Sequence, residues 1–167
     1  MCINKFMGFF RNNFFWVSIV ILVVALDRGS KILVIQHLPF EEPYPVLPIL
    51  NLLFTFNAGA AFSFLQGAGG WQEWMFGIIA ASVSLFLIIW LLKLKTTHSW
   101  LRMALALILG GTIGNLYDRI FFHRVIDFID FYWQTYHFAT FNLADAAICV
   151  GATMLVIDVA TKGKIFN

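Results

Sequence analysis

The chain contains four apolar stretches that are nearly free of charged side chains. They cover residues 12–26, 74–92, 103–117 and 138–157, and Asp145 is the only charged residue within any of them. A helix that crosses a membrane needs about 20 predominantly apolar residues. Because the first and third stretches are shorter than this, their helices must include the polar residues just beyond them. The pattern therefore predicts four membrane-spanning helices.

The residues at the ends of these stretches define the spans and their orientation. The spans are expected over about residues 12–34, 73–92, 101–118 and 139–158 of a single domain that covers residues 1–167. Cytoplasmic ends of membrane helices carry an excess of lysine and arginine. With the N-terminus inside, the cytoplasmic side holds Lys5, Arg11, Lys93, Lys95, Arg102, Lys162 and Lys164, whereas the outer side holds Arg28, Lys31, Arg119 and Arg124. This bias predicts that both termini are cytoplasmic. A cleaved signal peptide is the less favoured alternative, since it would remove a span and its cytoplasmic anchor.

The connector between the first two spans, at about residues 36–72, has a pattern of its own. All four prolines fall near its start, so none of them interrupts a span. Leu50–Asn57 then partly alternates between apolar and polar residues, which predicts a β-strand with Asn51, Thr55 and Asn57 on one face. Because the cytoplasmic connector is short and this one is structured, we expect function to face outward.

Composition agrees with this picture and excludes several classes of protein. Of the 167 residues, 60% are apolar and 12% are charged, whereas soluble domains average about 45–50% and about 25%. The net charge of +2 is too small for the basic footprint of a nucleic-acid binder.

The cysteines and histidines show no pattern of their own. Cys2 and Cys149 are too few for a disulfide framework, and we take both as incidental, with Cys149 as a packing residue. The four histidines are scattered without metal-ligand spacing, so no metal is expected.

Carboxyl groups at membrane depth are the candidate chemistry, because an acid in the hydrocarbon region costs several kcal/mol. Asp145 opens the fourth span, with Asn142 one turn before it. It is either a helix-start carboxylate favoured by the helix dipole or an acid that faces a polar cavity. Asp127 and Asp130 lie among apolar residues, and each alone is most simply an interfacial charge. A loop from Asp127 to Asp145 can bring these two carboxyls together, and such a pair retains one proton and can activate water.

The end of the third span combines small and polar residues. Gly110 and Gly114 form a G-x-x-x-G pattern, which predicts the close approach of a neighbouring helix. Close helix packing explains the glycines, but it does not explain the polar residues that follow them at the end of the span, Asn115, Asp118 and Arg119. We expect Arg119 to pair with Asp118 and to fix this end of the span.

Other interpretations stay open from the residues alone. Asp27 and Lys31 lie one helical turn apart and form either an interfacial ion pair or part of a site. Ser63 and Lys31 could form a nucleophilic pair, although nothing in the sequence brings them together. A proton-coupled carrier also needs intramembrane acids, but it usually shows internal repeats, which the sequence lacks. A structural membrane protein would explain the spans but not the outer acids and amides.

Five short motifs occur along the chain in a fixed order. They are Leu26-Asp27-x-x-Ser30-Lys31, Phe56-Asn57-Ala58-Gly59-Ala60-Ala61-Phe62, Gly110-Gly111-x-x-Gly114-Asn115-x-x-Asp118-Arg119, Val125-x-Asp127-Phe128-x-Asp130 and Phe141-Asn142-x-Ala144-Asp145. In this order, and over nearly the whole chain, they resemble the bacterial lipoprotein signal peptidases (type II signal peptidases). The resemblance implies an all-α integral membrane protein with four transmembrane helices. It also implies a small extracytoplasmic β-cradle with an interfacial helix between the first two spans.

The resemblance further implies an aspartyl endopeptidase of the bacterial cytoplasmic (inner) membrane that cuts just before a cysteine carrying diacylglycerol. Its catalytic aspartates correspond to Asp127 and Asp145, with the active site near the outer face. The remaining motif residues are expected to bind substrate or support the site: Asn57, Asn142, Arg119, Asp118, Asp27 and Asn115. The implied partners are diacylglyceryl-modified prolipoproteins, membrane lipids and globomycin-type inhibitors. No cofactor and no nucleic acid are expected, and the protein is expected to be a monomer.

Two positions depart from the pattern of that family. Glycine is common four residues before the first catalytic aspartate, where this chain has His123, and glutamine is common after the first-span aspartate, where it has Arg28. Neither change removes a catalytic group. His123 could alter the segment that carries Asp127 or its response to pH.

Overall fold

The computed structural model describes residues 2–58, 70–95 and 97–162. In chain order its elements are α1 (Cys2–His37), β1 (Pro43–Leu47), β2 (Leu50–Asn57), α2 (Trp71–Lys93), α3 (Ser99–Phe122), β3 (Val125–Trp133), β4 (Tyr136–His137) and α4 (Leu143–Lys162). The interfacial helix implied by the resemblance would fall at residues 59–69, as does Ser63, and both lie outside the described residues.

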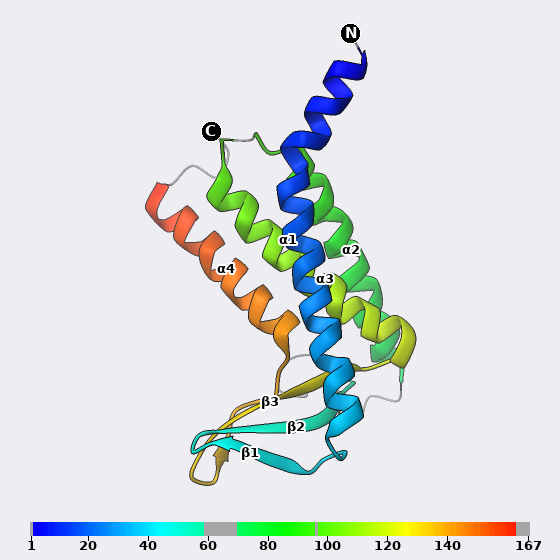
Figure 1. Cartoon of the computed structure of the whole chain (residues 1–167), viewed down its shortest axis with the longest axis vertical. Coiled ribbons are helices and arrows are strands. Elements are labelled where there is room, and N and C mark those ends of the chain that lie inside the picture. Colours follow the sequence, from blue (N-terminus) through cyan, green and yellow to red (C-terminus); the bar gives the residue numbers. More distant parts are fainter. Residues whose placement is uncertain (1, 59–69, 96, 163–167) are drawn as a thin grey trace.

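The helices form a bundle with the sheet across one end of it (Figure 1). The beginning of α1 and the end of α4 lie at the opposite end of the bundle (Figure 1). α3 is the central helix, because it packs against α1, α2 and α4. The apolar core that joins α1, α2 and α3 consists of Trp16, Leu87, Leu91, Leu101, Leu105 and Leu109.

Glycines of α3 allow α1 to approach closely, as the G-x-x-x-G pattern predicts. A Cβ atom at Gly110 would lie 2.7 Å from Cβ of Val23, and one at Gly114 would lie 2.7 Å from Oδ2 of Asp27. Larger residues would push the two helices apart, since packed interiors leave no room for an extra methyl group. The close packing brings the polar residues of α1 against those of α3, beside the sheet.

The strands form one antiparallel sheet in the order β1-β2-β3-β4. The sequence pattern predicts β-structure only between the first two spans and a loop from Asp127 to Asp145. This expectation is wrong, because Val125–Trp133 is a strand that pairs with β2. The first four residues of β3 are all buried, so this segment lacks the alternation of apolar and polar residues that indicates a half-exposed strand. The fold is therefore a helix bundle with a small sheet drawn from two connectors rather than all-α.

A β-bulge in β2 changes which side chains share a face. Leu52 pairs with Ile129 and Thr55 pairs with Asp127, so β2 holds one more residue than β3 over this interval. An extra residue reverses the alternation of side chains along a strand. Asn51 and Thr55 therefore lie on opposite faces, and the expectation of a single polar face is wrong.

Three helices among the described residues are long and apolar enough to cross a membrane: Trp71–Lys93, Ser99–Phe122 and Leu143–Thr161. Large apolar side chains such as Ile78, Phe86 and Val156 are exposed on the bundle. An apolar surface of this extent is typical of a face that contacts lipid. α1 is longer, at 36 residues, and three charged residues in the half next to the sheet interrupt its apolar stretch.

Candidate active site

A cavity of about 490 Å³ lies where β3 and the sheet-side ends of α3 and α4 meet. Its wall combines apolar side chains with a few polar groups. The lining residues are Asn57, Asn115, Arg119, Val125, Asp127, Phe138, Ala139, Thr140, Phe141, Asp145, Ala146, Ile148 and Cys149. An apolar cavity with a small number of convergent polar groups is typical of a substrate site.

Asp145 lies in the first turn of α4, where the sequence caps this helix. Its backbone N–H donates to Oδ1 of Asn142 at 2.9 Å, and the Asn142 N–H donates back to Oδ2 of Asp145 at 3.3 Å. This reciprocal pair is a capping box, and it explains why α4 begins at Leu143 rather than at residue 139. Oδ1 of Asp145 also accepts from Nδ2 of Asn115 at 2.7 Å. Asp145 is thus both a helix-start carboxylate and a cavity-lining acid.

Asp127 projects from β3 and is 2% exposed. Nδ2 of Asn57 donates to its Oδ2 at 3.1 Å, and Nδ2 of Asn142 donates to its Oδ1 at 2.7 Å. Burial, and secondarily the charge of Asp145, raise the pKa of Asp127 to about 7, while both amides and the Lys31 ammonium act in the opposite direction. A carboxyl with this pKa can carry a proton near neutral pH.

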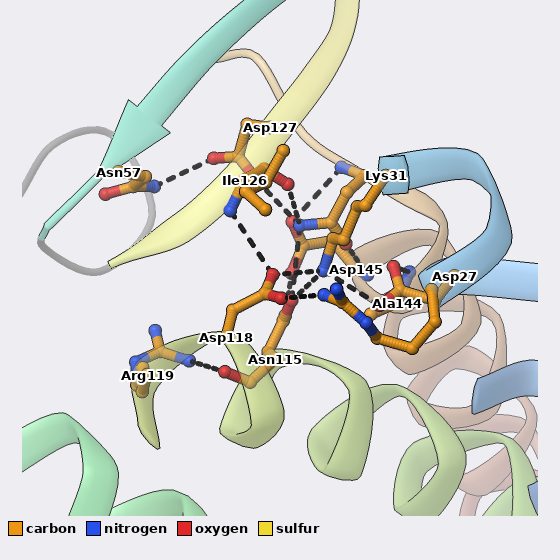
Figure 2. A network of polar contacts seen from close by, with 12 residues as sticks. Asp27, Lys31, Asn57, Asn115, Asp118, Arg119, Ile126, Asp127, Ala144 and Asp145 are labelled. Atoms are coloured by element: carbon orange, nitrogen blue, oxygen red, sulfur yellow. Dashed lines mark hydrogen bonds and ion pairs between the residues drawn. The ribbon is translucent and has the colours of Figure 1, made fainter. Parts of the chain in front are cut away.

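Asp118 was expected to pair with Arg119, and this expectation is wrong. The Asp118 carboxylate forms ion pairs with Arg28 and with Lys31, the latter at 2.7 Å. The reason is that α1 packs against α3 here and brings two cations to this carboxylate (Figure 2). Asp118 also accepts the backbone N–H of Ile126 at 3.3 Å, which joins the end of α3 to the start of β3.

Arg119 lines the cavity instead. Its Nη1 donates to the backbone carbonyl of Asn115 at 3.4 Å, and the guanidinium lies 5.9 Å from the centre of the Phe76 ring. Figure 2 shows Arg119 at the edge of the polar network. Because a guanidinium has five N–H donors, Arg119 is placed to donate to a group bound in the cavity.

Asp27 and Lys31 are fully buried in the protein interior beside the cavity. Nζ of Lys31 donates to Oδ2 of Asp27 at 2.8 Å. Oδ1 of Asp27 accepts the backbone N–H of Ala144 at 3.0 Å. This ion pair therefore connects α1 to the first turn of α4.

The two departures from the family pattern have local explanations. Arg28 pairs with Asp118 and lies 4.2 Å from the centre of the Tyr117 ring. His123 ends α3 with φ 61°, in the left-handed region. Glycine adopts this conformation with little strain, so the backbone explains why the family pattern described above would favour glycine at this position.

Asp130 does not reach the cavity. Its Oδ2 accepts from Nδ2 of Asn51 at 3.0 Å, and Nδ1 of His137 lies 3.0 Å from both of its oxygens. Asp130 is 1% exposed, so it is not the interfacial charge that its sequence context suggested. It lies three residues after Asp127 in β3, and alternation along a strand turns the two carboxyls to opposite faces.

Sequence reasoning missed two features of this site. Cys149 was taken as a packing residue, but it is exposed and lines the cavity. Its spacing of four residues from Asp145 was the available signal, since such positions share a helix face. The second feature is the segment 138–141, which forms one wall of the cavity. Within the described residues, no group of three or more His, Cys, Asp or Glu side chains could hold a metal ion.

The chain is similar to known proteins over most of its length. The family model described as signal peptidase (SPase) II matches residues 19–161. A lipoprotein signal peptidase of Shigella boydii serotype 4 is 48% identical over 143 residues, which cover 86% of this chain and 87% of the relative. The lipoprotein signal peptidase of Escherichia fergusonii is 47% identical over the same shares of both chains.

Two solved structures have the same fold. One, described as a bacterial membrane enzyme determined by the in meso method at 2.3 Å resolution, has a TM-score of 0.80 with 26% identity and covers 91% of both chains. A second, described in the same words at 1.9 Å resolution, has a TM-score of 0.76 with 27% identity and covers 87% of this chain and 92% of the other. The family match and the identity to these relatives establish that the chain belongs to the signal peptidase II family of aspartic-type membrane peptidases, which process lipoproteins.

Proposed function

We propose that this peptidase removes the signal peptide of diacylglyceryl-modified prolipoproteins by cleaving just before the lipidated cysteine, with Asp127 and Asp145 as its catalytic pair. The observation that carries this proposal is that both carboxyls line one largely apolar cavity and both accept hydrogen bonds from Asn142, Asp127 from its side-chain amide and Asp145 from its backbone N–H. Hydrogen bonds from three side-chain amides position the two carboxyls, those of Asn57, Asn115 and Asn142. Arg119 binds substrate.

The balance of charge around the cavity supports one shared proton. Four carboxyl groups interact here, those of Asp27, Asp118, Asp127 and Asp145. They face three cations, those of Arg28, Lys31 and Arg119. One carboxyl is therefore left without a compensating charge in a poorly hydrated site. Such a group retains its proton, because ionising it would bury a net charge.

The proton is assigned to Asp127 in this proposal. Its pKa is raised to about 7. Asp145 has a side-chain donor from Asn115 and lies at a helix N-terminus, two features that stabilise a carboxylate. Asp127 is thus the acid and Asp145 the base.

Hydrolysis follows from these roles. Asp145 takes a proton from a bound water, whose oxygen attacks the scissile carbonyl carbon while Asp127 donates its proton to the carbonyl oxygen. The tetrahedral diol then collapses: Asp145 passes its proton to the leaving amine nitrogen, the C–N bond breaks, and a diol hydroxyl returns a proton to Asp127. Arg119 can stabilise the developing negative charge on the oxygen.

The membrane arrangement forms part of the proposal. The chain would be a single domain with four spans in the bacterial inner membrane, with α1 supplying the span beyond the three apolar helices above. The beginning of α1 and the end of α4 lie at the end of the bundle away from the sheet, where the excess of basic residues lies (Figure 1). Both termini would then be cytoplasmic, and the cavity would open near the outer face, where lipid chains of the substrate can stay in the bilayer.

The test is cleavage of a diacylglyceryl-modified prolipoprotein by the purified protein in detergent, followed by gel shift. Asp127→Asn and Asp145→Asn should each abolish cleavage, and a globomycin-type inhibitor should block the wild type. Asp130→Asn is the matched control, since it changes a buried aspartate of the same strand outside the cavity. Near-normal cleavage by either dyad variant would overturn the catalytic assignment.

A further inference from the structure

Lys31 has an unusual environment for a lysine of a membrane protein. It is 0% exposed, and its ammonium contacts three oxygen atoms. These are Oδ2 of Asp27 at 2.8 Å, Oδ2 of Asp118 at 2.7 Å and Oδ1 of Asn115 at 3.1 Å. An ammonium has three N–H donors and no acceptor. Every donor of Lys31 therefore has an acceptor, at the centre of the network in Figure 2.

Two of these acceptors also hold the backbone that carries the catalytic pair. Asp27 accepts the N–H of Ala144, and Asp118 accepts the N–H of Ile126. Each of these backbone residues directly precedes one of the two aspartates. Lys31 thus connects α1 to the start of α4 and to the start of β3 through one intermediate carboxylate in each direction.

The third acceptor determines which end of an amide faces Asp145. Because the ammonium of Lys31 can only donate, the atom of Asn115 that faces it must be the oxygen. That oxygen also accepts from Nδ2 of Asn142 at 3.2 Å. The amide nitrogen of Asn115 is left to donate to Oδ1 of Asp145 at 2.7 Å. With the opposite orientation, an acceptor would face this carboxylate and would favour its protonated form.

We propose that Lys31 is a positioning residue of this peptidase: it orients the Asn115 amide toward Asp145 and anchors both backbone segments that carry the dyad. This inference rests on the dyad proposed above. Lys31 does not line the cavity, so it acts through its neighbours and does not touch substrate.

Removing this cation should change how the dyad titrates. Without Lys31, the Asn115 amide is free to reverse, so that its nitrogen no longer donates to the Asp145 carboxylate, and the dyad loses a nearby positive charge. Carboxyls ionise at higher pH in such an environment. The base needed for catalysis would then form at higher pH, so the acidic limb of the pH–activity profile shifts to higher pH.

The experiment compares Lys31→Met with Lys93→Met, which removes an exposed lysine at the far end of α2. Steady-state cleavage of a diacylglyceryl lipopeptide is measured across pH. Lys31→Met should lower kcat by about 10- to 100-fold, leave KM nearly unchanged and move the acidic limb upward by roughly one pH unit. Lys93→Met should match the wild type. An unchanged acidic limb in a folded Lys31→Met protein would overturn the proposal.

A double-mutant cycle tests whether Lys31 acts through Asn115. In an Asn115→Ala background, Lys31→Met should cost much less than it costs alone, because its route to Asp145 is already broken. Full additivity of the two losses would argue against this route. If Lys31→Met alone fails to fold, Asp27→Asn/Lys31→Met removes the unpaired buried carboxylate as well. A folded double variant with the wild-type kcat and acidic limb would also overturn the proposal.

Parallel assays of Asp127→Asn and Asp145→Asn separate this inference from the one on which it rests. If these variants are inactive while Lys31→Met behaves like the wild type, only the role of Lys31 falls. If they remain active, the dyad is wrong, and the role of Lys31 falls with it.

Discussion

The side-chain amide of Asn142 donates to Oδ1 of Asp127 at 2.7 Å, across the junction between α4 and β3. The carbonyl of the same amide accepts the backbone N–H of Asp145, so this one side chain contacts both members of the proposed dyad. Its orientation is fixed, because the helix cap requires an oxygen on one side and the nitrogen is then left for Asp127. Helix capping and assembly of the site are therefore performed by one residue.

Substitutions of Asn142 can separate these two tasks. Asn142→Ser keeps an N-cap side chain but loses the amide donor to Asp127, so cleavage should fall although the cap of α4 is retained. Asn142→Ala loses the cap as well, so it should be less stable than Asn142→Ser by about 1 kcal/mol. Thermal unfolding and gel-shift cleavage check this pair. A Ser variant with full activity would show that the bridge to Asp127 is not needed.

The raised pKa of Asp127 predicts a pH-dependent stability. Its ordinary value is 3.8 and its value in the folded protein is about 7, so the folded state binds more protons than the unfolded state between these values. Stability should therefore fall as pH rises through this window. Asp127→Asn removes the penalty and should be more stable than the wild type at pH 8, by a few kcal/mol at most. The gain should vanish below about pH 4. Thermal unfolding of both proteins at the two pH values is the measurement, and a variant less stable than the wild type at pH 8 would contradict it.

His123 occupies a backbone conformation that glycine adopts more readily. His123→Gly should raise stability by about 1 kcal/mol, because the left-handed conformation strains a residue with a Cβ atom. Loss of the ring contact with Trp74, at 5.9 Å, offsets part of this gain. His98→Gly is the matched control, since His98 has φ −90° and should show no comparable gain. A lower melting temperature for His123→Gly would mean that the contact with Trp74 outweighs the strain.

The exposed thiol of Cys149 lies on the cavity wall, one turn from Asp145. Alkylation with N-ethylmaleimide in a Cys2→Ser background should therefore block the cavity and remove most of the cleavage activity. The Cys149→Ser protein should resist the reagent and retain activity. Mass spectrometry confirms the modified residue. Full activity after complete alkylation of Cys149 would show that substrate does not pass this wall.

The sequence by itself determined the features that depend on neighbouring residues. Long apolar stretches indicate helices because the signal lies in consecutive residues and needs no contact with a distant part of the chain. The capping pattern Asn142-x-x-Asp145 and the tight G-x-x-x-G of α3 are local in the same sense. The motifs also predict that Asp127 and Asp145 lie together, and in the structure both line one cavity.

Tertiary structure alone decided which distant groups meet. Asp118 pairs with cations from α1 rather than with its neighbour Arg119, because helix packing brings those cations within reach. The bulge in β2 separates Asn51 from Thr55 on opposite faces, since one unpaired residue reverses the alternation. The pairing of Lys31 with Asp27 is an i,i+4 contact within α1, but its contacts with Asp118 and Asn115 of α3 follow from no local pattern.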